Sequence, residues 1–525
     1  MLNSSNGLRT VALFEGAKGL LVLLAGLGAL ELLHHNAQPA AEELVQHLRF
    51  NPASRYPRIF IQLAQQLTDS QLWLLGTGAR STQTSETTAG SSETFVSPPE
   101  IVSSNGVLSA MLTAGTATVK IENSNVLARV YNGLYMPPTL RVRPGDKIRL
   151  RLVNALNDPT NLHYHGLNVS PLGRSDNIFI HVRNSEVFDY EIAIPENHAS
   201  GLYWYHSHQH ALSESQVGGG MSGGLIVDGI LDPFPELKTV KERVMLLKDS
   251  QIDGIAISKS DDPAKSTRTL NGLTNPTIKI RPGETQFWRI GNIGAHGYYR
   301  LQLEGHTLHQ FAQDGNRLNQ ILELKEIVLP PSSRVEVFVQ GGTPGVYMLR
   351  SLAFNTGPRG DQNPEVPVAT VISEGPAAQP IRLPTKLPSL DDLRNRPVAR
   401  KRQIVFTESP GKFFINGKQF DMRRVDTTVN LGDIEEWTIR NASDEMHTFH
   451  IHQVDFQVIE VNGQQAPFVG VQDNVNVPVR GVVKILLPFT DPVIVGKFVY
   501  HCHILSHEDK GMMAVIEVKA RPRKP

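Results

Sequence analysis

From residue 96 onward, short runs of alternating hydrophobic and polar residues are separated by Gly, Pro and Asn. In the stretch PTLRVRPGDKIRLRLVN (138–154), hydrophobic residues occupy every second position on both sides of the turn Pro144, Gly145 and Asp146. Successive side chains of a strand point to opposite faces of a sheet, so two strands with one buried face produce this alternation. The pattern predicts an all-β fold for most of the chain.

This stretch occurs three times. PTIKIRPGETQFWRIGN (276–292) and TTVNLGDIEEWTIRN (427–441) repeat the pattern, and an Asn-Gly pair precedes each copy, at 132–133, 271–272 and 416–417. A long repeat of this kind indicates successive copies of one domain, each large enough to bury its own core. We predict three β-sandwich domains over residues 96–231, 232–375 and 401–525, with a proline-rich connector over 376–400.

The first 79 residues have a different pattern. Residues 11–33 (VALFEGAKGLLVLLAGLGALELL) are hydrophobic except for Glu15, Lys18 and Glu31, and their uncharged centre is shorter than a membrane span of about 20 residues. A signal sequence, a membrane anchor and an amphipathic helix packed on the next domain are the alternatives for this helical segment. The segment also resembles the start of a family of small bacterial membrane proteins. Residues 80–95, rich in Ser and Thr, are predicted to be a linker.

Charge excludes one class of partner. The chain has 51 Lys plus Arg and 51 Asp plus Glu, so it carries no net charge. Binding to nucleic acid depends on an excess of positive charge, and no nucleic-acid partner is expected.

Ten of the nineteen histidines fall in four short clusters: HYHG (163–166), HSH (206–208), HTFHIH (447–452) and HCHILSH (501–507). In a strand, each H-x-H presents two imidazoles on one face, although one pair alone is more often a solvated polar face. The first and third repeats carry their pairs at corresponding places, whereas the second has Leu349 and Arg350 instead of Tyr and His. Four pairs meeting between domains one and three would supply eight imidazoles, which suits about three coppers.

Cys502 is the only cysteine, and a histidine stands on each side of it. In a strand, its side chain points away from the face of His501 and His503, so its thiolate would bind a second metal site on the other side. His447, His507 and Met512 complete the two-His, one-Cys, weak axial Met set of an electron-transfer copper. A buried, inert thiol is the alternative.

Taken together, the motifs HYHG, HSH, HxxHxH and HCHxxxHxxxxM resemble the copper motifs of the three-domain multicopper oxidases, the family of laccases, ascorbate oxidase and bacterial metallo-oxidases. The resemblance covers roughly residues 113–519 and implies three cupredoxin-like Greek-key domains with four coppers. It implies that His163 and His450 bind the type 2 copper. The type 3 pair would be bound by His165, His206, His208, His452, His501 and His503. The type 1 copper would be bound by His447, Cys502, His507 and Met512.

The family implies oxidation of a donor at the type 1 copper, electron transfer through Cys502 and reduction of dioxygen to water at the trinuclear cluster. Oxygen reduction consumes protons, and Glu508 and Asp176 resemble the acids that bacterial members place near the cluster. Solvated surface carboxylates are the alternative reading of both residues.

A phenolic or aromatic donor is expected, because the ten methionines are scattered and form no Met-rich insert that would suit cuprous ion. A cuprous or other metal-ion oxidase is the alternative within this class. A non-catalytic protein is the alternative from another class: a scaffold would predict broken ligand sets, whereas a copper-binding protein would need the same ligands without turnover. The family suggests the periplasm or cell envelope of a bacterium, with membrane association through residues 11–33.

Overall fold

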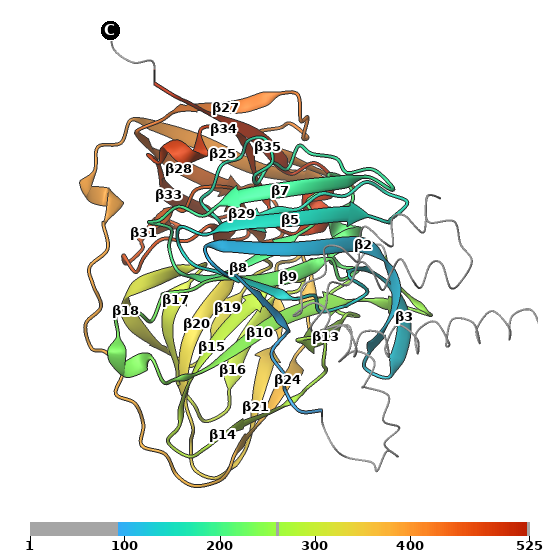
Figure 1. Ribbon diagram of the computed structural model, residues 1–525. Coiled ribbons are helices and arrows are strands. Elements are labelled where there is room, and N and C mark those ends of the chain that lie inside the picture. Colours follow the sequence, from blue (N-terminus) through green and yellow to red (C-terminus); the bar gives the residue numbers. More distant parts are fainter. Residues whose placement is uncertain (1–92, 259–261, 522–525) are drawn as a thin grey trace, which may run out of the picture. The chain divides into compact units, whose positions relative to one another are not determined.

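The computed structural model describes residues 93–258 and 262–521, and these residues form three successive pairs of β-sheets (Figure 1). The predicted all-β fold is confirmed. The predicted helical segment over 1–79 and most of the predicted linker lie outside the described residues. Within the described ranges, the helices are single turns, and none is long and apolar enough to cross a membrane. They are α5 (Ser213–Val217), α6 (Leu505–Asp509) and the 3-10 turns η1 (Pro235–Leu237), η2 (Leu393–Asn395) and η3 (Pro492–Ile494).

The first pair combines a five-stranded and a six-stranded sheet. In sheet order, the five strands are β1 (Glu100–Val102), β4 (Thr139–Val142), β9 (Ser222–Val227), β8 (Gly201–His206) and β6 (His163–His165). The six strands are β11 (Ile252–Asp253), β12 (Ala256–Ile257), β3 (Ser124–Tyr131), β2 (Val107–Ile121), β5 (Lys147–Asn154) and β7 (Val187–Ala193). The β11–β12 hairpin joins this sheet although its residues follow the expected start of the second domain at residue 232.

The second pair also combines a five-stranded and a six-stranded sheet. Its five-stranded sheet contains β14 (Thr277–Ile280), β24 (Val366–Ser373), β21 (Gly345–Leu352), β16 (Tyr299–Leu303) and β19 (Ile327–Leu329). Its six-stranded sheet contains β13 (Thr267–Leu270), β10 (Lys241–Ser250), β15 (Thr285–Asn292), β20 (Arg334–Gln340), β17 (Leu308–Gln313) and β18 (Asn316–Leu324). A small hairpin, β22 (Phe354–Asn355) and β23 (Gln362–Asn363), stands apart from both sheets.

The third pair repeats this arrangement. Its five-stranded sheet contains β27 (Val425–Asn430), β35 (Met513–Lys519), β34 (Gly496–Cys502), β29 (His447–Ile451) and β32 (Asn474–Val477). Its six-stranded sheet contains β26 (Lys412–Ile415), β25 (Arg400–Ser409), β28 (Asp433–Asn441), β33 (Val482–Phe489), β30 (Gln457–Val461) and β31 (Gln464–Gln465). The threefold internal repeat of the sequence is therefore matched by a repeat of strand order, in full between the second and third pairs and over four neighbouring strands of each sheet in the first.

The turn residues explain where the repeated strands end. At the first Asn-Gly pair, φ is 54° at Asn132 and 71° at Gly133, and the pairs at 271–272 and 416–417 are alike. A tight hairpin turn needs φ above zero at both central residues, and Asn and Gly tolerate this conformation best. Gly145 has φ of 88° in the turn between β4 and β5, where the Asp146 N–H donates to the Arg143 backbone oxygen, and Gly adopts this conformation without strain.

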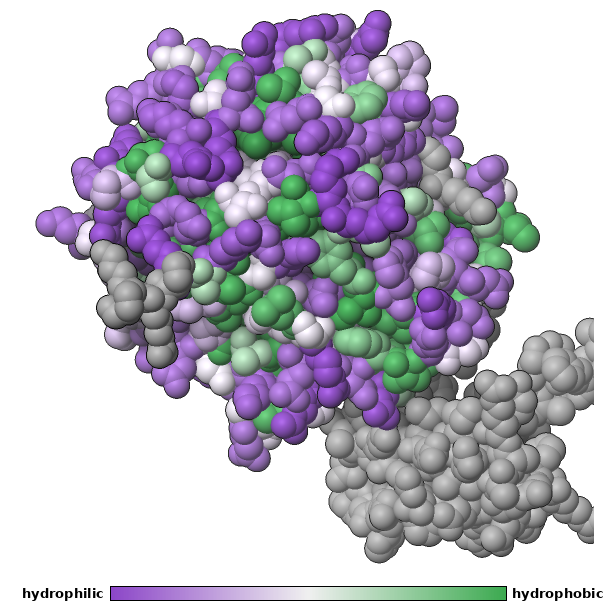
Figure 2. Space-filling model, turned by 90° about the horizontal axis from the view of Figure 1, so that it is seen from above, coloured by the Kyte–Doolittle hydropathy of each residue, from purple (hydrophilic) through white to green (hydrophobic). Residues whose placement is uncertain are grey.

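The predicted alternation is confirmed in the first repeat. The hydrophobic residues of the alternating stretch are all buried: Leu140, Val142, Ile148, Leu150 and Leu152. Each pair of sheets encloses its own hydrophobic cluster, to which both of its sheets contribute. Hydrophilic side chains cover most of the face in Figure 2, with hydrophobic ones in small groups between them.

A further cluster lies where the three pairs of sheets meet. It contains Leu202 and Trp204 from β8, Leu246 from β10 and Leu505 from α6. This junction fixes the positions of the strand ends that carry the histidine clusters.

Candidate metal centre

Strand pairing places the H-x-H motifs opposite one another. In the first pair of sheets, β6 is antiparallel to β8, with His163 opposite His206. In the third, β29 is antiparallel to β34, with His450 opposite His501. Each motif thus reaches the same end of its sheet as its partner, and the two ends face each other across the interface.

Eight buried histidines meet at this interface. They are His163, His165, His206, His208, His450, His452, His501 and His503. Across the interface, the ring of His163 stacks on that of His452 at 3.8 Å between centroids, and His165 stacks on His450 at 3.9 Å. The His501 Nε2 atom lies 3.3 Å from His208 Nε2 and 3.2 Å from His452 Nε2.

Seven of these histidines fall in groups whose possible ligand atoms lie within 4.8 Å of one another. The groups are His163, His165 and His206; His163, His450 and His452; and His208, His452 and His501. The ring of His503 lies 4.9 Å from that of His165 and 5.3 Å from that of His501. The structure therefore brings all eight predicted cluster ligands together.

Outer contacts hold several of these rings so that one nitrogen points inward. The Nδ1 atoms of His206 and His450 donate to the backbone oxygens of Ser207 and Asp473, at 2.8 and 2.7 Å. Their Nε2 atoms are buried and have no hydrogen-bond partner in the described part of the chain. Metal-binding histidines are typically oriented in this way by a partner on their other nitrogen.

The charge state suits metal binding. Burial, followed by the neighbouring histidines, lowers the pKa of His163, His452 and His503 well below the usual range. These three imidazoles are therefore neutral at physiological pH, each with a free lone pair. Many neutral imidazoles with inward nitrogens form a donor set that fits copper ions.

Cys502 lies on the other side of β34, in a separate site. Its Sγ atom is 3.5 Å from His447 Nδ1 and 3.8 Å from His507 Nδ1, and the two Nδ1 atoms are 3.3 Å apart. Met512 is buried in the same hydrophobic cluster, and its backbone oxygen accepts a hydrogen bond from the Cys502 N–H. Burial raises the pKa of the Cys502 thiol, so a bound metal would have to displace its proton.

The remaining nitrogens of this site have partners. The Ser443 hydroxyl lies 2.8 Å from His447 Nε2, and Glu445 Oε1 lies 2.8 Å from His507 Nε2. Phe413 stacks on the His507 ring at 4.1 Å between centroids. Both imidazoles therefore present Nδ1 to the sulfur, as a set of two histidines and one thiolate requires.

The two acids predicted near the cluster are both buried there. Asp176 Oδ1 lies 3.0 Å from His163 Nδ1. Burial raises the pKa of Asp176 to about 7, although hydrogen bonds from the Tyr164 N–H and the Gln453 amide act to lower it. Glu508 Oε2 lies 3.1 Å from His501 Nδ1. Burial acts to raise the pKa of Glu508, but the nearby His208 and His501 outweigh burial and lower it. Solvated surface carboxylates, the alternative reading, do not describe these positions.

Three supporting residues were missed by the sequence reasoning: Asp473, Arg334 and Gln453. Asp473 Oδ1 lies 3.3 Å from His165 Nε2, and Arg334 donates to both oxygens of this carboxylate. Gln453 donates from Nε2 to Asp176 Oδ2. Gln453 directly follows HTFHIH and could have been found from that position, whereas Asp473 and Arg334 stand in no motif.

Fold and site together define a class: an all-β redox protein whose mononuclear His-Cys-His site is joined by one strand to an eight-histidine cluster suited to copper. The chain belongs to the multicopper oxidase family. Three family models, each described as multicopper oxidase, match residues 113–230, 203–373 and 382–522. A fourth, described as a predicted membrane protein, matches residues 7–81, outside the described residues.

Individual relatives agree with this assignment. The chain is 28% identical over 410 residues to multicopper oxidase mco of Staphylococcus haemolyticus, which covers 75% of this chain and 84% of the relative. It is 27% identical over 414 residues to cell division protein FtsP of Escherichia coli, covering 74% and 85%. A solved multicopper oxidase from Campylobacter jejuni, described as a metallo-oxidase, matches with a TM-score of 0.73 and 26% identity over 82% of this chain and 96% of the other.

Proposed function

We propose that the chain is a laccase-like oxidase with four coppers, which oxidises a phenolic or aromatic donor one electron at a time and reduces dioxygen to water. The observation that carries the proposal is the sequence His501, Cys502, His503. Cys502 lies between His447 and His507, while both flanking histidines belong to the eight-histidine cluster. One tripeptide therefore joins the two sites covalently.

When bound, copper supplies one-electron redox chemistry at the cysteine site and four-electron chemistry toward dioxygen at the histidine cluster. His447, Cys502, His507 and Met512 would hold the type 1 ion. His163 and His450 would hold the type 2 ion. The type 3 pair would be held by His165, His206, His208, His452, His501 and His503.

The protein's acids hold protons where oxygen is reduced. Asp176 has a pKa of about 7, so near neutrality it can both give and accept a proton beside His163. Glu508 faces His501 on one oxygen and accepts a hydrogen bond from the Ser213 hydroxyl on the other. Two acids that contact different histidines of the cluster support its role in a reaction that consumes protons.

The donor would approach the cysteine site at Glu445. This carboxylate covers His507 Nε2, and burial raises its pKa to about 7, so it can accept a proton from a phenol as an electron leaves. The same carboxylate favours a second candidate, a cuprous or other metal-ion donor, because its ionised form attracts cations. Oxygen uptake with cuprous ion and with an electron-rich phenol at equal concentration separates the two candidates.

Cys502→Ser tests the electron path. The variant should lose the intense thiolate-to-copper absorption band and donor oxidation together, yet keep the copper held by the eight histidines. Oxygen uptake that survives in this variant at the parental rate contradicts the path. A non-catalytic copper-binding protein would bind copper without turnover in the parent, and a scaffold would bind none. This alternative is tested because the relatives of the chain include a cell division protein.

We further propose a cell-envelope location, with residues 11–33 as a membrane attachment. The match of residues 7–81 to a predicted membrane protein family supports this placement. Cell fractionation of the full chain and of a chain lacking the first 92 residues tests it. An identical distribution of the two proteins would refute the attachment.

A further inference from the structure

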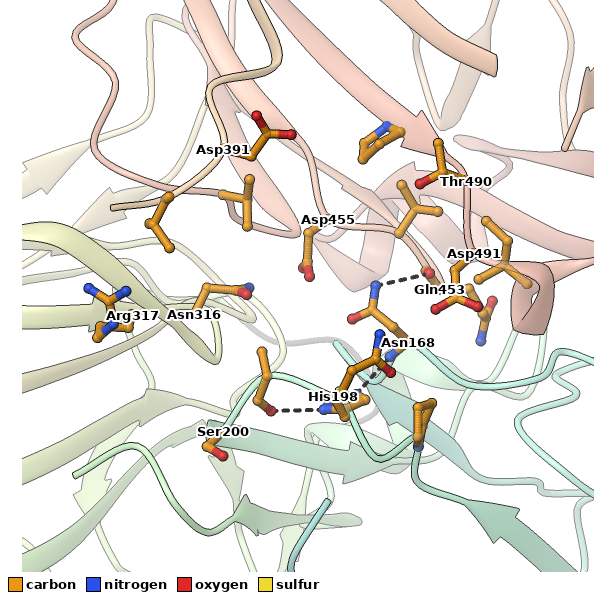
Figure 3. A pocket seen from close by; sticks show the side chains of 18 of the residues that line it. Asn168, His198, Ser200, Asn316, Arg317, Asp391, Gln453, Asp455, Thr490 and Asp491 are labelled. Carbon is orange, nitrogen blue, oxygen red and sulfur yellow. Dashed lines mark hydrogen bonds between the residues drawn. The ribbon is translucent and has the colours of Figure 1, made fainter. Parts of the chain in front are cut away.

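A cavity of about 540 Å³ lies where the three pairs of sheets meet (Figure 3). The first pair of sheets contributes wall residues from 195–200, and the second contributes residues 316–317. The third contributes residues from 453–455 and 488–494, and the connector contributes residues from 390–393. The cavity is separate from the Cys502 site, since none of the four type 1 ligands lines it. Its volume is in the range of small-molecule sites.

Gln453 forms the wall between this cavity and the histidine cluster. Its Nε2 donates to Asp176 Oδ2, and Asp176 Oδ1 lies 3.0 Å from His163 Nδ1. Its backbone oxygen accepts a hydrogen bond from Asn168 Nδ2, and its φ of 57° turns the chain directly after His452. Its Oε1 is buried without a hydrogen-bond partner among the described residues.

Asp455 lines the same cavity. Its Oδ1 is likewise buried, with no hydrogen-bond partner in the described ranges. The charged and titratable groups that face it are Asp473, Arg334, Asp314 and Tyr203, and its hydrogen-bond partner is Asn316. Burial, followed by the negative charge of Asp473, raises the pKa of Asp455 to about 8. The side chain is therefore protonated at neutral pH.

The other polar groups of the wall indicate water as the occupant. His198 uses both ring nitrogens, one accepting from the Asn168 N–H and one donating to the Ala199 backbone oxygen. The Arg317 guanidinium donates to the backbone oxygens of Leu318 and Pro388. The cavity is also lined by the carboxylates of Asp391, which pairs with Arg396, and Asp491. Buried oxygens without partners, as on Gln453 and Asp455, are the usual neighbours of ordered water.

We propose that this cavity is the inlet for the protons consumed in oxygen reduction, that Asp455 transfers them from solvent to the water inside, and that Gln453 is a positioning residue that holds Asp176 at the inner end. The inference rests on the proposed oxidase function. Reduction of one dioxygen to two waters takes four electrons, which come from the donor through Cys502, and four protons, which come from solvent. Asp455 gives a proton to the cavity water and regains one from solvent, so it is unchanged by each cycle.

Asp455→Asn in the copper-loaded full chain tests the inlet, because it keeps the shape and removes the acid. The donor should be a one-electron metal complex such as ferrocyanide, which releases no proton. The parental rate of oxygen uptake should fall as the pH rises through about 8, since the protonated form of Asp455 is lost there. The variant should be slower on the order of tenfold or more below that pH and should lack this decline.

Three further readouts separate this role from structural damage. Anaerobic bleaching of the thiolate-to-copper band by the donor should keep its parental rate, because it needs no proton from the cavity. Infrared difference spectra of parent and variant should contain the absorption of a protonated carboxyl that disappears above about pH 8. Asp391→Asn, at a cavity residue paired with Arg396, should behave as the parent does in all assays.

A double-mutant cycle with Gln453→Met tests the shared path. If both residues serve one path, the double variant should be no slower than the slower single variant, whereas multiplied losses would place them on separate paths. An Asp455→Asn variant with the parental rate and pH profile, equally slowed bleaching, or no protonated-carboxyl signal would overturn the inlet. A parent with neither thiolate band nor oxygen uptake would instead refute the proposed function, and the inlet with it.

Discussion

Asp473→Asn separates the structural and metal-binding roles of one carboxylate. Arg334 is fully buried and donates to Asp473 Oδ1 at 2.9 Å and Oδ2 at 2.6 Å. Removing one partner of a buried ion pair costs about 3–5 kcal/mol, because the other charge stays buried. The cost here should be about 3 kcal/mol, at the lower end, since Asp314 Oδ1 remains 3.6 Å from Arg334 Nη1. Chemical denaturation of the metal-free protein measures it.

The same substitution should weaken metal binding. Asp473 Oδ1 fixes the ring of His165 at 3.3 Å, and the loss of such an outer contact typically reduces metal affinity about 10–100-fold. Asp314→Asn is the matched control, because within the described part of the chain Asp314 contacts Arg334 but forms no hydrogen bond with any of the eight histidines. Burial and the charge of Asp473 raise the pKa of Asp314 to about 7, so about half of its side chains are protonated at neutral pH. The uncharged amide of Asn resembles this protonated form. Equal copper affinity in Asp473→Asn and the parent, by competition with a chelator, would refute the reasoning.

Three further outcomes are expected. Glu508→Gln should slow oxygen uptake on the order of 100-fold with donor bleaching unchanged, because it removes a buried acid beside the cluster; equal slowing of both steps would contradict this role. Glu445→Gln should raise the KM for a cationic donor roughly fivefold more than that for a neutral phenol, since a nearby charge is worth about 1 kcal/mol in water; equal changes would exclude the carboxylate as a donor contact. Gly166→Ala should lower the unfolding temperature, because its Cβ would lie 2.5 Å from Arg334 Nη2 and 2.6 Å from Asp473 Oδ2 at a φ of 87°; an unchanged temperature would argue that these side chains yield easily.

Short-range rules explain what the sequence could predict. Alternation with a period of two gave both the buried strand faces and the pairing of imidazoles in each H-x-H. The same rule placed Cys502 and its flanking histidines on opposite faces, as the contacts of Cys502 with His447 and of His501 with His452 show. These features depend on residues within a few positions of one another.

Contacts between domains could not be predicted in this way. Arg334 and Asp473 are 139 residues apart, and their pairing depends on how two sandwiches pack. Asp176 was indicated only through the family resemblance, because nothing in its local sequence shows that Gln453 of another domain reaches it. The β11–β12 hairpin joins the first sheet by pairing Ala256 with Leu127, which the repeat boundaries do not reveal.

The second domain illustrates how a unit without H-x-H pairs can still determine the metal sites. Its Arg334 also donates to the Leu202 backbone oxygen, so one guanidinium ties the first domain to the carboxylate that orients His165. Its Tyr298 hydroxyl lies 2.9 Å from Thr448 Oγ1, directly after His447, and the Thr448 backbone oxygen accepts a hydrogen bond from the His503 N–H. Both sites therefore depend on the second domain through outer contacts. A ring that is displaced no longer points its nitrogen at the metal, even when every ligand is present. The second repeat thus helps to position the ligands of the other two, although it supplies no H-x-H pair of its own.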